Sequence, residues 1–330
     1  MNITVLGNGG FGTAMALSQH RAGRTVRVLG HDHVYTSAIA ATGRNPRYLP
    51  DVELPPELLF TADPVVALRD TDLVLAAVPT QHLRETLLEL EDVMPESVPL
   101  VSLAKGLEQG SGLRPSEVLQ EVFPSSPILC LSGPSHAEEI ARNLPALVVI
   151  AGANDEVRRL VQTALTNETL RVYRNEDLLG VELCGALKNV IALAAGIAEG
   201  LGLGDNTKAA ILARGLFEMT RFGLAEGARP ETFHGLAGVG DLAVTAFSKH
   251  GRNRAFGERL GRGETLEQIL ESTQKVAEGV WTSRVVQERA RDLGIEMPLT
   301  DAVCSVLFGG LTPEAAVRAL MERAQRDETD

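Results

Sequence analysis

A glycine-rich turn near the start of the chain has the spacing of a phosphate-binding loop. Residues 7–12, Gly7-Asn8-Gly9-Gly10-Phe11-Gly12, fit the pattern G-x-G-x-x-G. The apolar residues 2–6 before the turn predict a buried strand, and residues 13–17 after it predict the start of a helix. The turn therefore predicts dinucleotide binding: Gly7 permits the tight turn, Gly9 lets the backbone approach a pyrophosphate, and Gly12 lets helix and strand pack closely.

A lysine inside the most apolar segment is the second feature that could do chemistry. Lys188 lies in the sequence G-A-L-K-N, within a helix that we predict over Glu182–Leu201. Burial disfavours a charged ammonium and lowers its pKa, which suits proton transfer near neutral pH. Asn189 adds a donor and an acceptor, and Gly185 leaves room for a ligand. The alternative is a lysine that reaches solvent at the helix edge, and the pattern favours the functional interpretation.

Two further groups follow predicted strands directly. Lys105 comes after the strand Pro99–Ser102, and its ammonium could bind a phosphate or orient a carbonyl oxygen. Gly133 and Ser135 come after the strand Ile128–Leu131, where Ser135 has the chemistry of a helix N-cap and the new helix could accept an anion. A solvated lysine and a simple capped turn remain open as alternatives.

A glycine-rich bend in the second half of the chain carries an acid and a basic run. Asp241 could orient a lysine or a substrate hydroxyl. Gly251-Arg252-Asn253-Arg254 offers a guanidinium fork for a phosphate. A charged surface loop would have the same composition, so the residues alone leave both interpretations open.

The end of the second predicted strand, Thr25–Leu29, bears on the choice of cofactor. An acid that reads the ribose is expected about 20 residues after the glycine motif, and Asp32 has about that spacing. His31 could instead face an adenosine phosphate. Both residues could also merely cap the next helix. NAD and NADP therefore both remain open.

Alternation of strands and helices places these residues. Candidate strands at Asn2–Leu6, Thr25–Leu29, Leu73–Ala77, Pro99–Ser102, Ile128–Leu131, Ala146–Ile150 and Leu170–Tyr173 are separated by helical patterns. This order predicts an α/β Rossmann-like, doubly wound parallel sheet over residues 1–175. Residues 176–330 read as an all-helical domain, which begins with a long apolar helix. Ligands of open α/β sheets lie beyond the carboxyl ends of the strands, so we expect substrate in the cleft between domains.

Composition excludes several classes of function. The 330 residues are 44% hydrophobic and 22% charged, as in ordinary globular proteins, and the net charge of −12 disfavours nucleic acid and anionic membranes as partners. The most apolar stretch, Val190–Ile197, is too short to span a bilayer, so no membrane insertion is expected. The three scattered cysteines indicate a reducing cytoplasm. The histidines show no metal-binding spacing, and we expect no metal.

Taken together, the motifs resemble those of the NAD(P)-dependent glycerol-3-phosphate dehydrogenases, particularly the bacterial soluble type. The resemblance spans nearly the full length, and no single motif is decisive. The matching motifs are G-N-G-G-F-G-T at Gly7, L-G-H-D at Leu29, N-P-R-Y-L-P at Asn45, A-K-G-L at Ala104, S-G-P-S at Ser132, A-L-K-N-V at Ala186, G-V-G-D-L at Gly238, G-R-N-R at Gly251 and V-A-E-G at Val276.

This resemblance implies reversible hydride transfer between dihydroxyacetone phosphate and sn-glycerol 3-phosphate, with NAD or NADP as cofactor and a product that feeds phospholipid synthesis. It implies that Lys188 is the general acid/base, and that a homodimer forms. Implied substrate contacts are Lys105, Gly133, Ser135, Lys188, Asn189, Asp241, Gly251, Arg252 and Asn253. Implied cofactor contacts are Gly7, Gly9, Gly10, Phe11, Gly12, His31, Tyr48, Lys105, Ala137, Arg252, Val276 and Glu278.

Two departures from the family pattern and two rival functions remain. Gly251 stands where the family often has serine, and Ser135 where threonine is common. A dehydrogenase of the β-hydroxyacid type would also place a lysine on an apolar helix, but it would prefer a carboxylate substrate. A non-catalytic dinucleotide sensor would need the glycine turn, but it would have no use for Lys188, Asp241 and Arg252 together.

Overall fold

The computed structural model describes residues 1–249, 251–273, 277–325 and 327–328. The chain divides into two compact units. The first comprises Met1–Gly185 and Glu231–Asp241, and the second comprises Ala186–Pro230 and Leu242–Asp330. The segment Glu231–Asp241 therefore returns to the first unit after the chain has entered the second.

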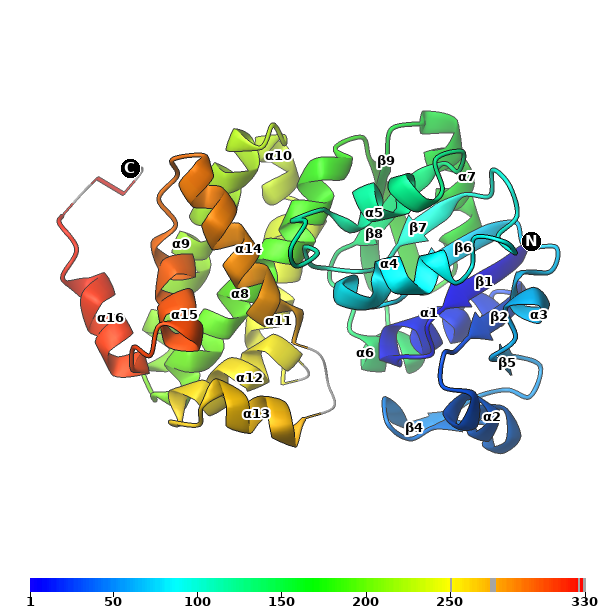
Figure 1. Ribbon diagram of the computed structural model, residues 1–330, viewed down its shortest axis with the longest axis horizontal. Coiled ribbons are helices and arrows are strands. Elements are labelled where there is room, and N and C mark those ends of the chain that lie inside the picture. Colours follow the sequence, from blue (N-terminus) through cyan, green and yellow to red (C-terminus); the bar gives the residue numbers. More distant parts are fainter. Residues whose placement is uncertain (250, 274–276, 326, 329–330) are drawn as a thin grey trace. The chain divides into compact units, whose positions relative to one another are not determined.

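An eight-stranded sheet forms the centre of the first unit, in the order β10-β9-β8-β7-β6-β1-β2-β5 (Figure 1). Seven of these strands were predicted, with every boundary within two residues, because most of them are buried apolar runs. The strands are β1 (Asn2–Leu6), β2 (Thr25–Leu29), β5 (Leu59–Thr61), β6 (Leu73–Ala76), β7 (Leu100–Ser102), β8 (Ile128–Ser132), β9 (Ala146–Gly152) and β10 (Leu170–Asn175).

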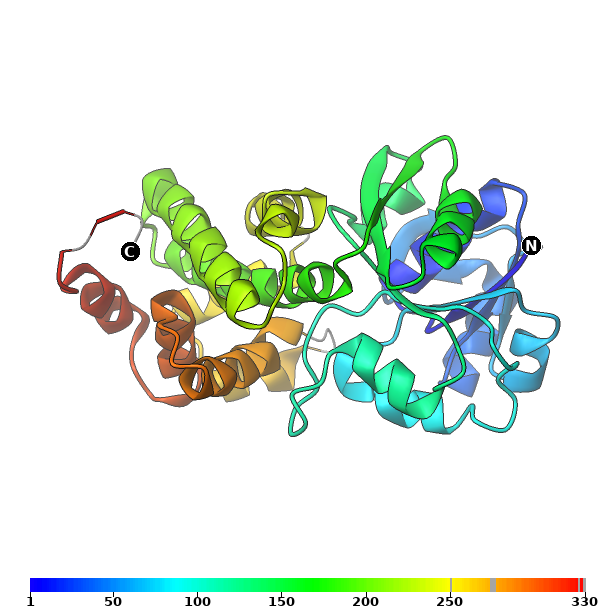
Figure 2. The same ribbon diagram turned by 90° about the horizontal axis from the view of Figure 1, so that it is seen from above.

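Helices cover both faces of the sheet, as a doubly wound fold requires (Figure 2). Ile3 and Val5 of β1 belong to the apolar core on one face, together with residues of α1, α2, α6 and α7. Leu6 belongs to the core on the other face, together with residues of α3, α4 and α5. The helices are α1 (Gly10–Arg21), α2 (His33–Thr42), α3 (Pro64–Leu68), α4 (Thr80–Leu88), α5 (Pro115–Val122), α6 (Ala137–Ala141) and α7 (Asp155–Leu165).

The sheet differs from the prediction in direction and in content. It is not wholly parallel, because β9 pairs antiparallel with β8 and parallel with β10. Buried strands read as the same apolar runs in either direction, so periodicity could not show the reversal. Strand β5 and the hairpin of β3 (Arg44–Asn45) and β4 (Leu49–Glu53) were not predicted. Strand β3 is two polar residues, β4 contains a proline, and β5 is only three residues long.

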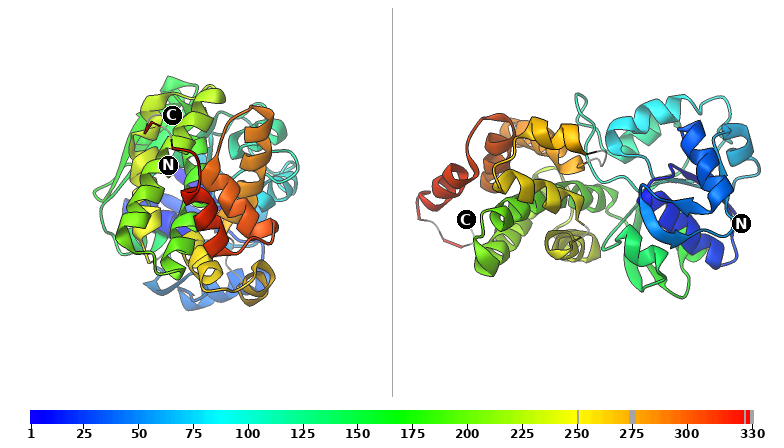
Figure 3. Two further views of the ribbon diagram at one scale, coloured as in Figure 1. Left: turned by 90° about the vertical axis from the view of Figure 1, so that its left-hand side faces the viewer. Right: turned by 90° about the horizontal axis from the view of Figure 1, so that it is seen from below.

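Every regular element described after β10 is a helix (Figure 3). These elements are α8 (Leu178–Gly200), α9 (Gly204–Ala225), α10 (Pro230–Phe233), the π-helical turn η1 (Leu236–Gly240), α11 (Asp241–Phe247), α12 (Arg252–Gly261), α13 (Leu266–Ser272), α14 (Glu278–Asp292), α15 (Pro298–Phe308) and α16 (Pro313–Met321). The predicted boundary at residue 175 falls just before α8, whereas the compact units separate within α8, at Gly185. The boundary at 175 stays a prediction.

Helix α8 is the apolar axis of the second unit. Glycines on both helices allow α12 to cross α8 backbone to backbone, because a Cβ at Gly196 of α8 would collide with the Arg254 carbonyl, and one at Gly257 of α12 with the Leu193 carbonyl. At 23 residues α8 is long and apolar enough to cross a membrane. The short length of the stretch Val190–Ile197 therefore does not by itself exclude a membrane span. However, 89% of its most apolar window is buried within the structure, which is typical of a core helix.

A buried glutamate holds the start of α15. The N-cap residue Met297 has no polar side chain, and Glu218 of α9 takes over this function. Its carboxyl oxygens accept hydrogen bonds from the Leu299 N–H at 2.6 Å and from the N–H and hydroxyl of Thr300 at 3.2 Å. Desolvation nevertheless raises the pKa of Glu218 to about 7, with a smaller contribution from Asp301.

This raised pKa predicts a stability change with pH. Between pH 4.5 and 7 folded Glu218 keeps a proton that the unfolded chain has released, so its contribution to stability falls as pH rises. Glu218→Gln cannot ionise and should lack this fall, which amounts to up to about 3 kcal/mol. Urea unfolding of both proteins across this range measures the difference. Glu288→Gln, which removes an exposed carboxylate on α14, is the control. A difference between wild type and Glu218→Gln that does not change with pH would contradict the prediction.

Candidate functional site

The glycine turn has the geometry that a dinucleotide requires. Gly7 has a positive φ of 101°, and a Cβ there would lie 2.8 Å from the Ala77 carbonyl oxygen. A Cβ at Gly12 would collide with the carbonyl of Gly7, so only glycine permits this approach of α1 to β1. Gly9 is the N-cap of α1, with no side-chain cap and with open space around it. The start of α1 therefore presents backbone N–H groups to open space, as a pyrophosphate site would need.

Several predicted cofactor residues lie together around this turn. A Cβ on Gly10 would lie 3.7 Å from the Cβ atoms of both Tyr48 and Ala137. The Lys105 ammonium lies 6.0 Å from the centroid of the Phe11 ring. The structure thus groups residues that are far apart in the sequence on one side of the first unit.

Asn45 supports the turn from the hairpin of β3 and β4, and the sequence analysis gave it no role. It is fully buried, and its amide donates to the Asn8 carbonyl at 2.9 Å and to the Thr13 hydroxyl at 2.8 Å. Its own oxygen accepts from the Tyr35 hydroxyl at 2.6 Å. The only signal in the sequence was its place at the head of N-P-R-Y-L-P.

The end of β2 shows what His31 and Asp32 do in this structure. Asp32 is the N-cap of α2, and its side chain accepts from the Tyr35 N–H at 2.9 Å. That hydrogen bond, with a smaller contribution from Arg47, holds the pKa of Asp32 below its ordinary value. Asp32 therefore caps α2 through one of its oxygens, whereas His31 is exposed and is not the cap.

Lys105 is the centre of the predicted substrate residues that belong to the first unit. Its Nζ donates to Asp241 Oδ2 at 2.7 Å and to the Gly133 carbonyl at 3.1 Å, and it lies 3.4 Å from Ser135 Oγ. Strands β7 and β8 are parallel neighbours, so residues 105 and 133 meet at the same sheet edge. Asp241 arrives there because the segment Glu231–Asp241 belongs to this unit, through a π-helical turn that is typical of functional sites.

Two local expectations in this region are wrong. Ser135 does not cap α6, because the N-cap is His136 and the Ser135 hydroxyl donates back to the Gly133 carbonyl at 2.8 Å. Gly185 does not leave open room for a ligand either. A Cβ there would lie 3.1 Å from Ser132 Oγ and 3.4 Å from Lys105 Cγ, so these atoms fill the space.

In the second unit Lys188 is buried, as its apolar context predicted, and only 5% exposed. Its Nζ lies 2.8 Å from the hydroxyl of Thr245, which is also buried. Thr245 follows Asp241 by four residues, so both lie on one face of α11. That spacing was the sequence signal for Thr245, to which no role had been assigned.

The starts of α12 and α14 converge next to Asn189. Asn253 Oδ1 accepts from the Gly279 N–H at 3.0 Å, and a Cβ on Gly279 would lie 2.6 Å from the Asn189 carbonyl. Asn253 is buried, whereas Arg252, the first residue of α12, is exposed. Glu278 is the first residue of α14 and is buried. Predicted residues of the second unit therefore meet, although they come from three helices.

The departure at Gly251 has a local physical reason. Gly251 is the N-cap of α12, and a Cβ there would lie 2.8 Å from the Thr245 carbonyl oxygen and 3.3 Å from the Ser248 carbonyl oxygen. A serine would require the backbone to shift. The predicted cofactor residue Val276 lies outside the described residues.

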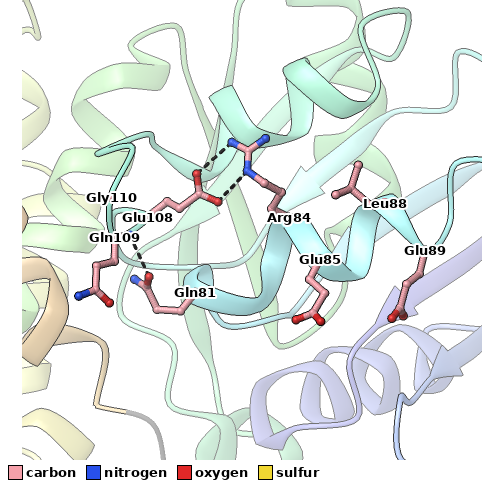
Figure 4. Close-up of a pocket in the computed structure, with 8 residues that line it drawn as sticks. All are labelled: Gln81, Arg84, Glu85, Leu88, Glu89, Glu108, Gln109 and Gly110. Carbon is pink, nitrogen blue, oxygen red and sulfur yellow. Dashed lines mark hydrogen bonds and ion pairs between the residues drawn. The ribbon is translucent and has the colours of Figure 1, made fainter.

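A surface hollow of about 920 Å³ lies elsewhere on the first unit (Figure 4). The Arg84 guanidinium donates to both carboxylate oxygens of Glu108 at 2.9 Å, and Gln81 accepts from the Gln109 N–H. None of the predicted site residues lines this hollow. Within the described part of the chain, no three His, Cys, Asp or Glu side chains are placed to hold a metal ion.

Comparison with known proteins identifies the family. The family model described as NAD-dependent glycerol-3-phosphate dehydrogenase N-terminus matches residues 2–158, and the C-terminal model matches residues 177–318. Glycerol-3-phosphate dehydrogenase [NAD(P)+] of Desulfitobacterium hafniense is 46% identical over 99% of this chain and 93% of its own. The enzyme of the same name from Leptothrix cholodnii is 47% identical over the whole of both chains.

Solved structures agree. The crystal structure of glycerol-3-phosphate dehydrogenase from Coxiella burnetii matches with a TM-score of 0.93 and 37% identity, over 98% of this chain and 99% of that one. A ketopantoate reductase from Ralstonia eutropha, at 16% identity and a TM-score of 0.62, shares the fold alone. With both family models in chain order and relatives above 40% identity over the full length, the chain belongs to the NAD-dependent glycerol-3-phosphate dehydrogenase family.

Proposed function

We propose that this protein reduces dihydroxyacetone phosphate to sn-glycerol 3-phosphate, reversibly, with NAD(P)H, and that the product supplies phospholipid synthesis. The observation that carries the proposal is the buried Lys188, whose ammonium lies 2.8 Å from the Thr245 hydroxyl in a chain whose relatives are glycerol-3-phosphate dehydrogenases. The glycine turn fits a dinucleotide, because Gly12 packs the start of α1 closely against the end of β1 and a Cβ at Gly9 would meet only open space, where a pyrophosphate can approach.

Hydride transfer, proton transfer and positioning of the proton donor are assigned to different groups. Bound nicotinamide supplies or accepts the hydride. Lys188 donates a proton to the carbonyl oxygen during reduction and removes the hydroxyl proton in the reverse direction. Thr245 fixes the direction of the Lys188 ammonium through its hydroxyl.

The remaining substrate groups bind and orient. Lys105, held by Asp241, contributes a positive charge for the substrate oxygens. Arg252 and Asn253 at the start of α12 would bind the phosphate, since a guanidinium fork and helix N–H groups both suit it. Ser135, Gly133 and Asn189 shape the surroundings of these charges.

The acid/base role makes a first prediction. Lys188→Ala should lower kcat by roughly 100- to 10,000-fold, which is the usual contribution of general acid/base catalysis. Cofactor binding, followed by calorimetry, should persist because the glycine turn lies in the other unit. Lys208→Ala, which removes a lysine paired with Glu199 on the same unit, is the control and should keep normal turnover. Near-normal kcat in Lys188→Ala would rule out this role.

Thr245 makes a second prediction, as a positioning residue. Thr245→Val keeps the shape but loses the hydroxyl, so kcat for dihydroxyacetone phosphate should fall roughly 10- to 100-fold with little change in cofactor affinity. The pH profile of kcat should shift as well, because the hydroxyl interacts with the titrating ammonium. Thr245→Ser should restore most of both. If valine and serine behave alike, the hydroxyl does not position Lys188.

We also propose that the protein forms a homodimer in the cytoplasm. The family resemblance supports the dimer, and the three cysteines, buried and free, suit a reducing compartment. Size-exclusion chromatography with light scattering tests the dimer directly, since a monomeric mass at micromolar concentration would exclude it.

A further inference from the structure

The residue directly after β2 has no room for a side chain unless two buried side chains move. In dinucleotide domains an acid near this strand end accepts the ribose hydroxyls of NAD, and a nearby arginine accommodates the 2′-phosphate of NADP. Here the position is Gly30, where a Cβ would collide with Thr36 Oγ1 and Asn8 Nδ2. Those two atoms are hydrogen-bonded to each other at 3.0 Å and are buried. Recognition of the ribose therefore falls to groups beyond Gly30.

The charged groups available there form one ion pair. Asp32 directs Oδ1 to the Tyr35 N–H and Oδ2 to the Arg47 guanidinium, 3.5 Å away. The side chains are 35% and 52% exposed, respectively, so a ligand can reach both. His31 is exposed beside them, and its ring N–H can donate a further hydrogen bond.

Arg47 is held in place before any ligand arrives. Its guanidinium carbon lies 4.1 Å from the centroid of the Tyr35 ring, a cation–π contact. Its backbone N–H donates to the Tyr35 hydroxyl at 3.1 Å, and that hydroxyl donates to Asn45 Oδ1. Asn45 in turn holds the Asn8 carbonyl of the glycine turn. A continuous chain of hydrogen bonds thus fixes Arg47 relative to the turn that would hold the pyrophosphate.

We propose that Arg47 binds the 2′-phosphate of NADP(H), and that the Asp32–Arg47 pair sets the relative affinity for NADP(H) and NAD(H). This inference rests on the proposed function and names the residue that selects its cofactor. A planar guanidinium suits a phosphate, to which it can donate two parallel hydrogen bonds. Asp32 opposes this binding, because its carboxylate repels the phosphate and competes for Arg47. With NAD(H), the same carboxylate can accept a ribose hydroxyl, so one pair serves either cofactor.

Calorimetry of the full-length protein with two fragments isolates this step from catalysis. Adenosine 2′,5′-bisphosphate carries the 2′-phosphate, and 5′-AMP lacks it. Arg47→Gln should weaken binding of the bisphosphate roughly tenfold or more, as expected for a charge-assisted hydrogen bond, and leave 5′-AMP within about twofold. Asp32→Asn should strengthen the bisphosphate relative to 5′-AMP. The bisphosphate preference of wild type should also shrink as salt is raised.

The hairpin offers a matched control. Arg44 lies three residues before Arg47 and pairs with Glu53, so Arg44→Gln removes the same charge away from Asp32. It should change neither affinity. Equal losses in Arg44→Gln and Arg47→Gln, or equal losses of both fragments in Arg47→Gln, would overturn the inference, since general charge or altered folding would then explain the effect. Thermal unfolding of each variant identifies loss of fold.

Failure of this inference is distinguishable from failure of the proposed function. If wild type turns over dihydroxyacetone phosphate but Arg47→Gln keeps the wild-type ratio of the two fragment affinities, only the role of Arg47 is overturned. If the fragment ratio changes as expected but wild type has no turnover, the inference is supported and the substrate assignment is overturned. The KM ratio for NADPH and NADH then checks whether the fragment result holds for whole cofactors.

Discussion

The ion pair between Lys105 and Asp241 is the constraint on which much of the first unit depends. Asp241 is 1% exposed, and a carboxylate so deeply buried is costly without a cation and hydrogen bonds. Lys105 supplies the cation at 2.7 Å and also binds the carbonyl of Gly133. One ammonium thus joins the ends of β7 and β8 to Asp241, more than 100 residues later in the chain, and stabilises the placement of the segment Glu231–Asp241 in this unit.

Absent side chains are as decisive as present ones. Gly12 brings α1 so close to the end of β1, and Gly7 brings the turn so close to the Ala77 carbonyl, that a methyl group at either position would force the backbone to move. Gly30 likewise has no side chain at the end of β2, and the hydrogen-bonded side chains of Asn8 and Thr36 occupy the space where its Cβ would lie. That arrangement stabilises the turn from within, but it moves the discriminating charges outward to Asp32 and Arg47. The demand for close packing therefore determines which residues remain available for recognition.

Strands and buried positions could be predicted because they depend on the local sequence pattern. Strand direction and side-chain partners could not, because they depend on which distant segments meet in space. The apolar runs of β1, β2, β6, β7 and β8 and the burial of Lys188 could be predicted, because burial appears as composition. The reversal of β9 could not, since a buried strand has the same composition in either direction. Ser135 is not the cap because α6 begins one residue later, with His136 as its N-cap, and the role of Thr245 could not be predicted without the position of Lys188.

Hydrogen bonds connect Arg47 through Tyr35 and Asn45 to the glycine turn. The residues at the two ends of this series contribute differently: one to the binding of any dinucleotide, the other to the choice between NAD(H) and NADP(H). The Asn45 amide donates to the Asn8 carbonyl and the Thr13 hydroxyl, which belong to the glycine turn and α1, so this contribution is common to every dinucleotide. Arg47 differs because its guanidinium faces a group that one cofactor has and the other lacks. An interaction made equally with both ligands cannot change their ratio, however strong it is. Selectivity between the two cofactors is therefore confined to Arg47, at the exposed end of this series of hydrogen bonds. Asn45, at the buried end, fixes the geometry on which binding of both cofactors depends.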